Sequence, residues 1–268
     1  MNILCIGDIF GKPGREALAA RLASLIERYA VDFTIVNWEN AAGGRGVTPD
    51  VARDLLALPV DVFTSGNHIW QHAALAPLLA DPRVLRPHNA PAGRPGKGVG
   101  MYAARNGTSV GVINMQGRAH MYEEKLLANP FLMVEPLLEQ MRRDTRIICI
   151  DLHAEVTSEK RAMGWWVDGK ASCLFGTHTH VQTADEQILP RGTAYITDLG
   201  MTGPHASVLG ARAEDAIKRF LSDGREKSWK PATGGVRIEG IVVEIDPDSG
   251  RSRRIERFQE PFDSAAHL

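Results

Sequence analysis

Residues 2–8 read NILCIGD, an apolar run that ends in a glycine and an acidic residue. Runs of the same kind return as FTIVNWE at 33–39 and as VFTSGNH at 62–68. Each run has the length of a buried strand, and a helical pattern at 16–29 separates the first two. Strands that alternate with helices of this length predict βαβ units and a mainly parallel sheet. We therefore expect an α/β protein.

The same patterns continue along the chain, which becomes richer in strands towards its end. The strands that we expect are Asn2–Gly7, Phe33–Trp38, Val60–Thr64, Val99–Ala103, Ser109–Asn114, Arg146–Ile150, Ala171–Phe175, Thr193–Thr197, Gly240–Ile245 and Arg253–Phe258. The expected helices are Glu16–Tyr29, one that begins at Pro49 after Thr48, Ala73–Leu79, Phe131–Met141 and one near Glu214–Leu221. Residues 81–98, rich in proline and glycine, predict a loop, and Asn106-Gly107 predicts a hairpin turn. At 268 residues the chain has the length of one large domain or two small ones, and without an internal repeat we expect a single domain, 1–268.

The composition indicates a globular protein without a strong net charge. Hydrophobic residues make up 44 % and charged residues 24 %, which excludes disorder and fibrous repeats as the main theme. The formal net charge is −1, so charge does not indicate RNA as a partner, and any such contact would be local. The basic run RSRRIER at 251–257 is short and favours a solvated strand face. Composition leaves open whether the chain forms a homo-oligomer.

Cysteine usage and the lengths of the apolar runs indicate a compartment. Cys5, Cys149 and Cys173 each lie inside an apolar run, so we expect buried free thiols, as in a reducing compartment. The stretch MNILCIGDIF lacks the basic part and the long apolar part of a signal peptide. No apolar run approaches the ~20 residues that span a bilayer. We therefore expect a cytoplasmic protein without a membrane partner.

Side chains that can ligate metals follow several of the expected strands directly. Because sites in open α/β sheets form at the carboxyl ends of strands, these residues are expected to converge from distant parts of the sequence. They are Asp8, Glu39, Asn40, Asn67, His153, His178 and His180. Four oxygen donors and three imidazoles are too many for one tetrahedral zinc with an open position. The set suits two metal ions that share one carboxylate.

Each of these residues has a simpler explanation when it is taken alone. Asp8 would also serve as a turn residue before Gly11, and Asn67 after Gly66 would serve as a turn residue or helix cap. The metal hypothesis depends on the joint pattern, because independent structural roles would all have to fall at strand ends. The other histidines lie mostly in polar or loop contexts and are expected at the surface or at caps: His72, His88, His120, His205 and His267.

Two glycine-rich segments resemble nucleotide-binding loops only superficially. In Gly7–Pro13 the spacing is one residue short, and Pro13 stands where a phosphate loop has serine or threonine. The sequence GKGVG at 96–100 lacks the spacing of a dinucleotide loop. Neither segment predicts a nucleotide cofactor. The basic residues near the ligand-bearing loops, which are candidates for contact with a substrate phosphate, are Lys12, Arg15 and Arg45.

Taken together, several blocks resemble the signatures of calcineurin-like metallophosphoesterases. These blocks are Gly7-Asp8, Ser65-Gly66-Asn67-His68 and Gly176-Thr177-His178-Thr179-His180. Longer strings between residues 7 and 204 resemble the YmdB-like phosphodiesterase subfamily: GDIFGKPGR, NWENAAGG, SGNHIW, DLHAE, GTHTHVQTAD and TDLGMTGP. The resemblance implies an αββα sandwich of two mixed sheets flanked by helices, in which the late strands complete the second sheet. Residues 81–98 and 116–130 would be loops around the site.

The resemblance also implies roles for individual side chains. One metal is expected on Asp8, Glu39, Asn40 and His180, and the other on Glu39, Asn67, His153 and His178. Phe10 stands where the superfamily usually has a ligating histidine, and Ile69 replaces the acidic residue that often follows Asn-His. His68 is the expected proton donor. Imidazole and carboxamide ligands without thiolate suit iron, manganese or zinc, and the resemblance favours iron.

The activity implied by the resemblance is hydrolysis of small cyclic nucleotides such as 2′,3′-cyclic AMP. Two divalent ions would lower the pKa of a bridging water, and the resulting hydroxide would attack phosphorus. His68 would protonate the leaving oxygen. Two alternatives stay open: a phosphomonoesterase or nucleotidase on the same metals, and a non-catalytic regulator that senses a nucleotide or RNA. The complete ligand set together with His68 favours turnover.

Overall fold

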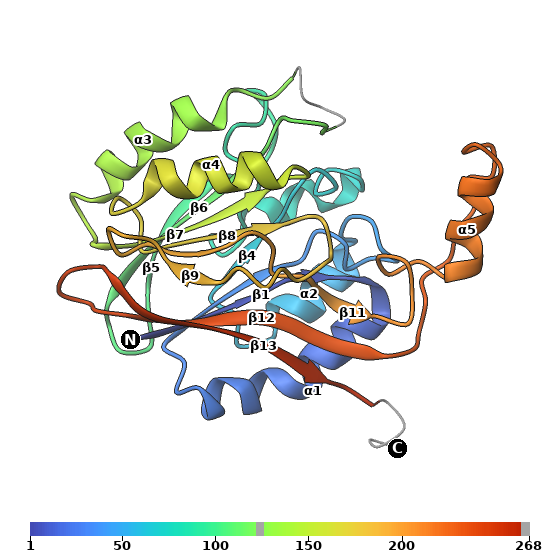
Figure 1. Ribbon diagram of the computed structural model, residues 1–268, viewed down its shortest axis with the longest axis horizontal. Coiled ribbons are helices and arrows are strands. Elements are labelled where there is room, and N and C mark those ends of the chain that lie inside the picture. The colour runs from blue at the N-terminus through green and yellow to red at the C-terminus, as the bar shows by residue number, and fades with distance from the viewer. Residues whose placement is uncertain (122–125, 264–268) are drawn as a thin grey trace.

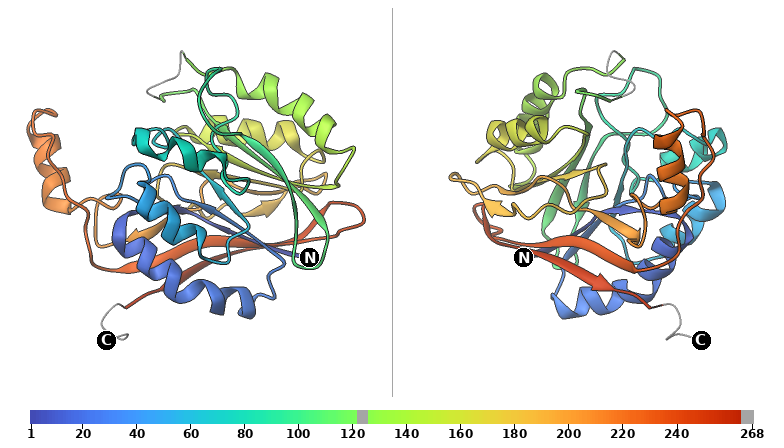
Figure 2. Two further views of the ribbon diagram at one scale, coloured as in Figure 1. Left: turned by 180° about the vertical axis from the view of Figure 1, so that it is seen from behind. Right: turned by 45° about the vertical axis from the view of Figure 1, so that its right-hand side comes forward.

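The computed structural model of the protein describes residues 1–121 and 126–263. Two β-sheets lie face to face, and helices cover the outer face of each sheet (Figure 1). The views from behind and from the side show the same four layers (Figure 2). This arrangement is the layered αββα sandwich of two mixed sheets that the sequence predicts.

The first sheet combines the early parallel strands with late antiparallel ones. Its seven strands are β1 (Asn2–Ile6), β2 (Asp8–Ile9), β3 (Phe33–Asn37), β4 (Val62–Thr64), β11 (Met201–Pro204), β12 (Val236–Ile245) and β13 (Ser252–Pro261). Their order is β2-β11-β12-β1-β3-β4, and β13 pairs with β12. β1, β3 and β4 are parallel, whereas β12 runs antiparallel to both β1 and β13. The expectation that all late strands complete the second sheet is therefore wrong for β12 and β13.

The second sheet has a parallel centre with antiparallel edges. Its strands are β5 (Val99–Ala103), β6 (Ser109–Gln116), β7 (Ile147–His153), β8 (Cys173–Thr177), β9 (Gln187–Ile188) and β10 (Ala194–Ile196), in the order β5-β6-β7-β8-β10-β9. β6, β7, β8 and β10 are parallel, while β5 and β9 are antiparallel to their neighbours. The hairpin predicted around Asn106-Gly107 joins β5 to β6.

Helices pack on the outer faces of both sheets. The elements outside the first sheet are α1 (Gly11–Arg28), α2 (Pro49–Leu56) and the 3-10 helix η1 (Ala73–Ala80), and those outside the second are α3 (Pro130–Met141) and α4 (Thr157–Val167). The helix expected over Ala73–Leu79 has 3-10 geometry and contains Pro77, which cannot donate an α-helical hydrogen bond. The sequence patterns missed α4 altogether.

Strand alternation separates the apolar side chains into three cores. On β1, Ile3 and Cys5 face the second sheet, while Leu4 and Ile6 face the helices. The core between the sheets includes all three cysteines, which are buried and free, as predicted. A third core joins the second sheet to α3 and α4. Among the residues described, no helix has the length and apolar character that crossing a bilayer requires.

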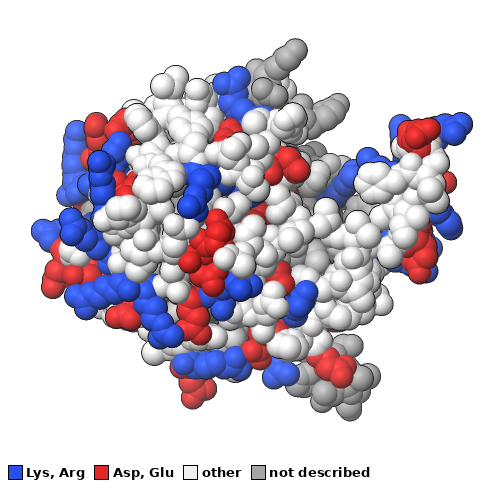
Figure 3. Space-filling view, in the orientation of Figure 1, with Lys and Arg blue, Asp and Glu red and all other residues white. Residues whose placement is uncertain are grey.

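One segment leaves this layered body. Residues 205–235, which we call the arm, connect β11 to β12 and carry α5 (Ala213–Leu221). The two sides of the arm are hydrogen-bonded near its base, where Arg212 N–H bonds Lys230 O and Ala232 N–H bonds Gly210 O. No residue of α5 is buried. In the space-filling view, α5 stands apart from the body (Figure 3).

Candidate metal centre

The side chains predicted to converge do meet at one edge of the sandwich. Asp8 follows β1, Glu39 and Asn40 follow β3, and Asn67 follows β4 in the first sheet. His153 ends β7, and His178 and His180 follow β8 in the second. The two sheets are joined there, because Asn37 Nδ2 on β3 donates to Asp151 Oδ2 on β7 at 3.0 Å.

His153 lies at the centre of one group of contacts. Its Nε2 is 3.1 Å from Glu39 Oε1, 3.1 Å from Asn67 Oδ1 and 3.0 Å from His178 Nδ1. The other nitrogen of the His178 ring, Nε2, lies 3.1 Å from Glu155 Oε2. One proton on His153 Nε2 can serve only one of its three neighbours. The ligand atoms of Glu39, His153 and His178 all lie within 4.8 Å of one another, which suits a shared cation.

A buried hydrogen-bond chain fixes the orientation of His153. Its Nδ1 is 2.9 Å from Thr177 Oγ1, and the Thr177 hydroxyl donates to Asp151 Oδ1 at 2.7 Å. Because the hydroxyl proton goes to the carboxylate, its oxygen accepts from Nδ1–H of His153. The Nε2 atom is therefore the one presented to the centre. Metal-ligating histidines are commonly oriented by such outer hydrogen bonds.

Glu39 connects this group to a second one. Its Oε1 also accepts from Asn40 Nδ2 at 3.1 Å, and Asn40 Nδ2 is 3.1 Å from His180 Nε2. His180 Nδ1 lies 3.1 Å from Leu209 O, so Nδ1 carries the proton and the lone pair of Nε2 accepts from Asn40 Nδ2. The contacts thus form two groups that share Glu39, and the bridging role of this carboxylate stays a prediction.

The remaining predicted residues pack against this centre. Asp8 Oδ2 accepts from His178 N–H at 3.2 Å, and Glu39 Oε2 accepts from His68 N–H at 3.2 Å. A Cβ on Gly66 would lie 2.1 Å from His153 Nε2 and 2.3 Å from Glu39 Oε2. Only glycine therefore lets the chain that carries Asn67 and His68 approach so closely.

Two buried oxygens support the fit to metal ions. Asp8 Oδ1 and Asn40 Oδ1 are buried and make no hydrogen bond within the described chain. Buried polar atoms are rarely left without a partner, so each such atom calls for a ligand. Carboxylate and carboxamide oxygens next to imidazole nitrogens form a donor set suited to first-row transition metals. The residues present therefore fit the predicted pair of divalent ions.

Electrostatics within the chain favour a positive charge at this place. Burial raises the pKa of Asp8 well above its usual range, and the charge of Glu39 adds to that effect. Burial alone would lower the pKa of His153, but Glu39 and Asp8 outweigh burial and raise it to about 9. Burial and the positive charge of His153 lower the pKa of His178 to about 3. A bound cation would replace the proton on His153, because metal binding and protonation compete for the same lone pair.

Comparison with known proteins covers nearly the whole chain. A family described as YmdB-like protein matches residues 4–258. The chain belongs to the YmdB-like family. A 2′,3′-cyclic-nucleotide 2′-phosphodiesterase of Bacillus subtilis is 44 % identical over 259 residues, which cover 96 % of each protein.

Two solved structures share the fold of this YmdB-like chain. A hypothetical protein from Thermus thermophilus superposes with a TM-score of 0.89 at 37 % identity, covering 97 % of this chain and 99 % of the other. A structure described as a novel phosphatase from Mycoplasma pneumoniae superposes with a TM-score of 0.90 at 32 % identity, covering 99 % and 95 %. The layered architecture is thus shared by this chain and both of these proteins.

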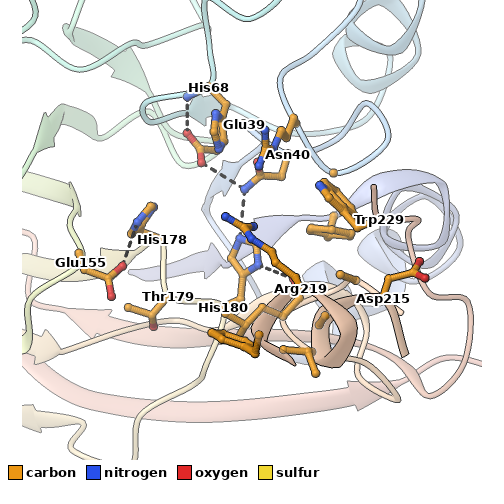
Figure 4. Close-up of a pocket in the computed structure, with 18 residues that line it drawn as sticks. Glu39, Asn40, His68, Glu155, His178, Thr179, His180, Asp215, Arg219 and Trp229 are labelled. Atoms are coloured by element: carbon orange, nitrogen blue, oxygen red, sulfur yellow. Dashed lines mark hydrogen bonds and ion pairs between the residues drawn. The ribbon is translucent and has the colours of Figure 1, made fainter. Parts of the chain in front are cut away.

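The centre opens into a cavity of about 670 Å³ with two unlike walls. One wall, which we call the strand-end wall, contains Glu39, Asn40, His68, His178 and His180 (Figure 4). Asp8, Asn67 and His153 are not among the lining residues and lie behind it. Five predicted residues thus face the cavity, while Asp8 and His153 are fully buried and the partly exposed Asn67 contacts His153.

The opposite side, which we call the arm wall, is largely apolar and aromatic. Its lining residues from the arm are Val208, Leu209, Ala211, Asp215, Ala216, Arg219, Phe220 and Trp229. Phe10 lies between the walls: its ring is 5.5 Å from the His180 ring and 6.0 Å from the Trp229 ring, centre to centre. The position that usually carries a histidine ligand therefore carries an apolar contact between the centre and the arm.

Of the basic residues proposed to contact a substrate phosphate, one lines the cavity and two do not. Arg45 lines the cavity with its guanidinium 5.7 Å from the centre of the Trp229 ring. Arg15 donates to Ala41 O, and Lys12 pairs with Glu16, so neither lines the cavity. The structure describes four of the histidines that were expected outside the site. None of these four lines the cavity: His72, His88, His120 and His205. His267 and residues 122–125 lie outside the described chain.

The sequence patterns missed several residues that contact the centre. Asp151 directly follows the expected strand Arg146–Ile150, and Asp198 directly follows the expected strand Thr193–Thr197, so the strand-end rule would have found both. Trp229 and Arg219 carry no comparable signal, because they come from an irregular segment and from an exposed helix.

Proposed function

We propose that this chain is a metal-dependent phosphodiesterase that hydrolyses small cyclic nucleotides such as 2′,3′-cyclic AMP. The observation that carries the proposal is the convergence of Glu39, Asn67 and His178 on Nε2 of His153, since one proton cannot satisfy all three. The name of the Bacillus subtilis relative supports the substrate class.

Two divalent ions are proposed, with iron preferred and manganese or zinc as alternatives. One would be held by Asp8, Glu39, Asn40 and His180, and the other by Glu39, Asn67, His153 and His178. The two contact groups that share Glu39 support this division. When bound, such ions supply an activated water and neutralise the charge that builds on the phosphate oxygens.

The protein itself would supply the proton for the leaving oxygen. His68 lines the cavity beside Glu39, to which its backbone N–H is bonded, and it is not in either ligand set. An alkoxide leaves poorly unless it is protonated, and a positioned imidazole is a common general acid. His68 is therefore the proposed catalytic proton donor.

The arm wall suits the rest of a nucleotide. Trp229, Phe10 and Phe220 line the cavity next to the strand-end wall, and aromatic side chains bind nucleobases by stacking. Arg45 and Arg219 line the same cavity and would offset the negative charge of a phosphodiester. In a nucleotide, the ribose joins a flat base to a phosphate. The aromatic arm wall would bind the base, and the metal centre would bind the phosphate.

A substrate panel tests the activity. The metal-loaded protein should hydrolyse 2′,3′-cyclic AMP with a kcat/KM at least about tenfold above that for 2′-AMP and 3′-AMP, equal to about 1.4 kcal/mol in barrier. Chromatography of the product should give 3′-AMP if the 2′ ester bond is cleaved, as the name of the relative indicates for that protein.

A phosphomonoesterase is the second candidate, favoured by the description of the Mycoplasma pneumoniae structure as a phosphatase. Faster turnover of the monophosphates by about tenfold would replace the diesterase proposal with this one. Tight binding of the cyclic nucleotide without turnover of any ester would instead indicate a sensor.

A further inference from the structure

Lys160 and Asp198 form an ion pair that is buried completely on both sides. Lys160 lies on α4, Asp198 follows β10, and Lys160 Nζ is 2.6 Å from Asp198 Oδ2. Both side chains are 0 % exposed. Burying two charges removes their hydration, which costs free energy. Proteins in which apolar residues replace such a pair are often equally stable, so a contribution to folding stability is a poor explanation for the pair.

Asp198 connects this pair to the loop that carries two candidate ligands. Its Oδ2 accepts from the backbone N–H of Thr179 at 3.2 Å and from the Thr179 hydroxyl at 2.8 Å. Its Oδ1 accepts from Gly200 N–H at 2.9 Å. Thr179 is the residue between His178 and His180. Asp198 therefore holds the middle of the loop from which both imidazoles project.

The loop needs such support because of its backbone conformation. The φ angle is +99° at His178 and +63° at His180. Residues with a Cβ are rarely found at positive φ, and they persist there only where surrounding contacts fix them. The hydrogen bonds of Thr179 to Asp198 anchor the one residue between these two strained positions.

Gly176 shows how the sequence makes room for Lys160. A Cβ at this position of β8 would lie 2.7 Å from Lys160 Cδ and 1.9 Å from Thr197 O. The missing side chain lets the aliphatic stem of Lys160 cross the strand and reach Asp198. The glycine that opens the string GTHTH is thus explained by packing against α4 and the segment after β10.

We propose that Lys160 and Asp198 are a positioning pair that places His178 and His180 for metal binding through Thr179. This inference rests on the proposed metal centre. A carboxylate is needed because Asp198 accepts hydrogen bonds on both oxygens, whereas an asparagine has one oxygen and an amide donor. Lys160 is needed because it balances the buried carboxylate. Neither residue touches the cavity, so they act through the loop.

The first experiment compares metal affinity in folded variants. Asp198→Asn alone leaves Lys160 without its partner, so the neutral double variant Lys160→Met/Asp198→Asn is measured beside it. The affinity for Mn²⁺, measured by competition with a chelator, should fall at least about tenfold, as for other outer residues that orient metal ligands. The matched control is Lys170→Met/Glu135→Gln, which removes an ion pair between α3 and the turn after α4. The control should keep wild-type affinity.

Thr179 gives a test that does not depend on the buried charges. Thr179→Val removes the hydroxyl that donates to Asp198, and Thr179→Ser keeps it. The valine variant should lose Mn²⁺ affinity and the serine variant should recover it. Wild-type affinity in folded Lys160→Met/Asp198→Asn and in Thr179→Val would overturn the proposal, leaving the pair a purely structural link between α4 and the sheet.

A metal-free readout separates this inference from the proposed function. The imidazole ¹⁵N resonances of His178 and His180 should shift in Thr179→Val and return in Thr179→Ser without any ion present. Unchanged resonances would overturn the positioning role. If the wild-type protein hydrolyses no phosphate ester while these resonances and the Mn²⁺ affinity respond as expected, the proposed function fails and the positioning pair stands.

Discussion

The strand-end wall and the arm wall enclose the same cavity but are built in opposite ways. Glu39 and the three ligand candidates behind the strand-end wall are held by strands of two sheets and by buried and partly buried hydrogen bonds. The arm wall comes from one segment, 205–235, whose helix α5 has no buried residue. Phe220 is 79 % exposed although it lines the cavity.

This difference separates two requirements of a hydrolase. Groups that hold ions and move protons must be fixed within fractions of an ångström, which buried strand ends with supporting hydrogen bonds provide. Groups that bind the remote part of a substrate contribute binding energy and tolerate variation in their position. A projecting arm can supply such groups. Substitutions in the strand-end wall are therefore expected to abolish metal binding or chemistry, and substitutions in the arm wall to weaken substrate binding.

The largest effect is expected from Glu39→Ala. Glu39 contacts both groups of candidate ligands, whereas Asn40 and His153 each belong to one. The alanine variant should fall from about two bound ions per chain to fewer than about one, and lose activity with them. Metal analysis by mass spectrometry of folded protein measures this.

Asn40→Ala and His153→Ala are the matched comparisons for Glu39. Each should retain more total metal than Glu39→Ala, because each removes a ligand from one ion only. Retention of both ions in Glu39→Ala would show that this carboxylate does not bridge the two groups.

The next effect concerns His68 and depends on the leaving group. His68→Gln should keep both ions, because the side chain is in neither ligand set. Its kcat on 2′,3′-cyclic AMP should fall by ~10²–10⁴-fold, the usual contribution of a general acid. Its activity on bis-p-nitrophenyl phosphate should fall far less, since nitrophenolate leaves without a proton. Equal losses on both substrates would assign His68 to binding or orientation instead.

The strand-end wall was predictable from the sequence because its geometry follows from local rules. Apolar runs identified the strands, parallel pairing brought their carboxyl ends together, and residues such as Asp8, Glu39 and His153 followed from that edge. The same rule applied once more would have included Asp198. The role of Lys160 could not be predicted from the sequence, because its helix was not expected and because its partner lies 38 positions away in the sequence.

The arm wall was not predictable, for physical reasons. A helix near Glu214–Leu221 was expected and is present as α5. Its apolar residues Ile217, Phe220 and Leu221 lie exposed, so periodicity could not tell which face would meet the cavity. Trp229 lies in the irregular segment between α5 and β12, which carries no strand pattern. Sheet membership of β12 was also missed, because strand patterns do not specify which neighbour a late strand pairs with.

A moderate effect is expected from Trp229→Ala in the arm wall. Loss of stacking should cost about 1–3 kcal/mol of binding free energy, the usual contribution of an aromatic side chain to a bound base. The kcat/KM for 2′,3′-cyclic AMP should fall accordingly. The change should appear in KM, with bound metal unchanged. Trp165→Ala is the control, since Trp165 is an exposed tryptophan on α4 that does not line the cavity. A fall in kcat at constant KM would place Trp229 among the groups that act on the transition state.

The smallest effect is expected from Leu221→Ala at the end of α5. Leu221 is 80 % exposed, and alanine and leucine have similar helix propensities, so the free energy of unfolding should change by less than about 0.5 kcal/mol. The same substitution in the core, Leu18→Ala on α1, removes a fully buried side chain and should lose about 2–5 kcal/mol. Urea unfolding of both variants gives the comparison directly. A loss above about 2 kcal/mol in Leu221→Ala, together with a stability that rises with protein concentration, would show that a second copy of the chain covers α5. Contacts between two copies of the chain would then hold the arm wall in place. The difference in burial between the arm wall and the strand-end wall would apply only to the isolated chain.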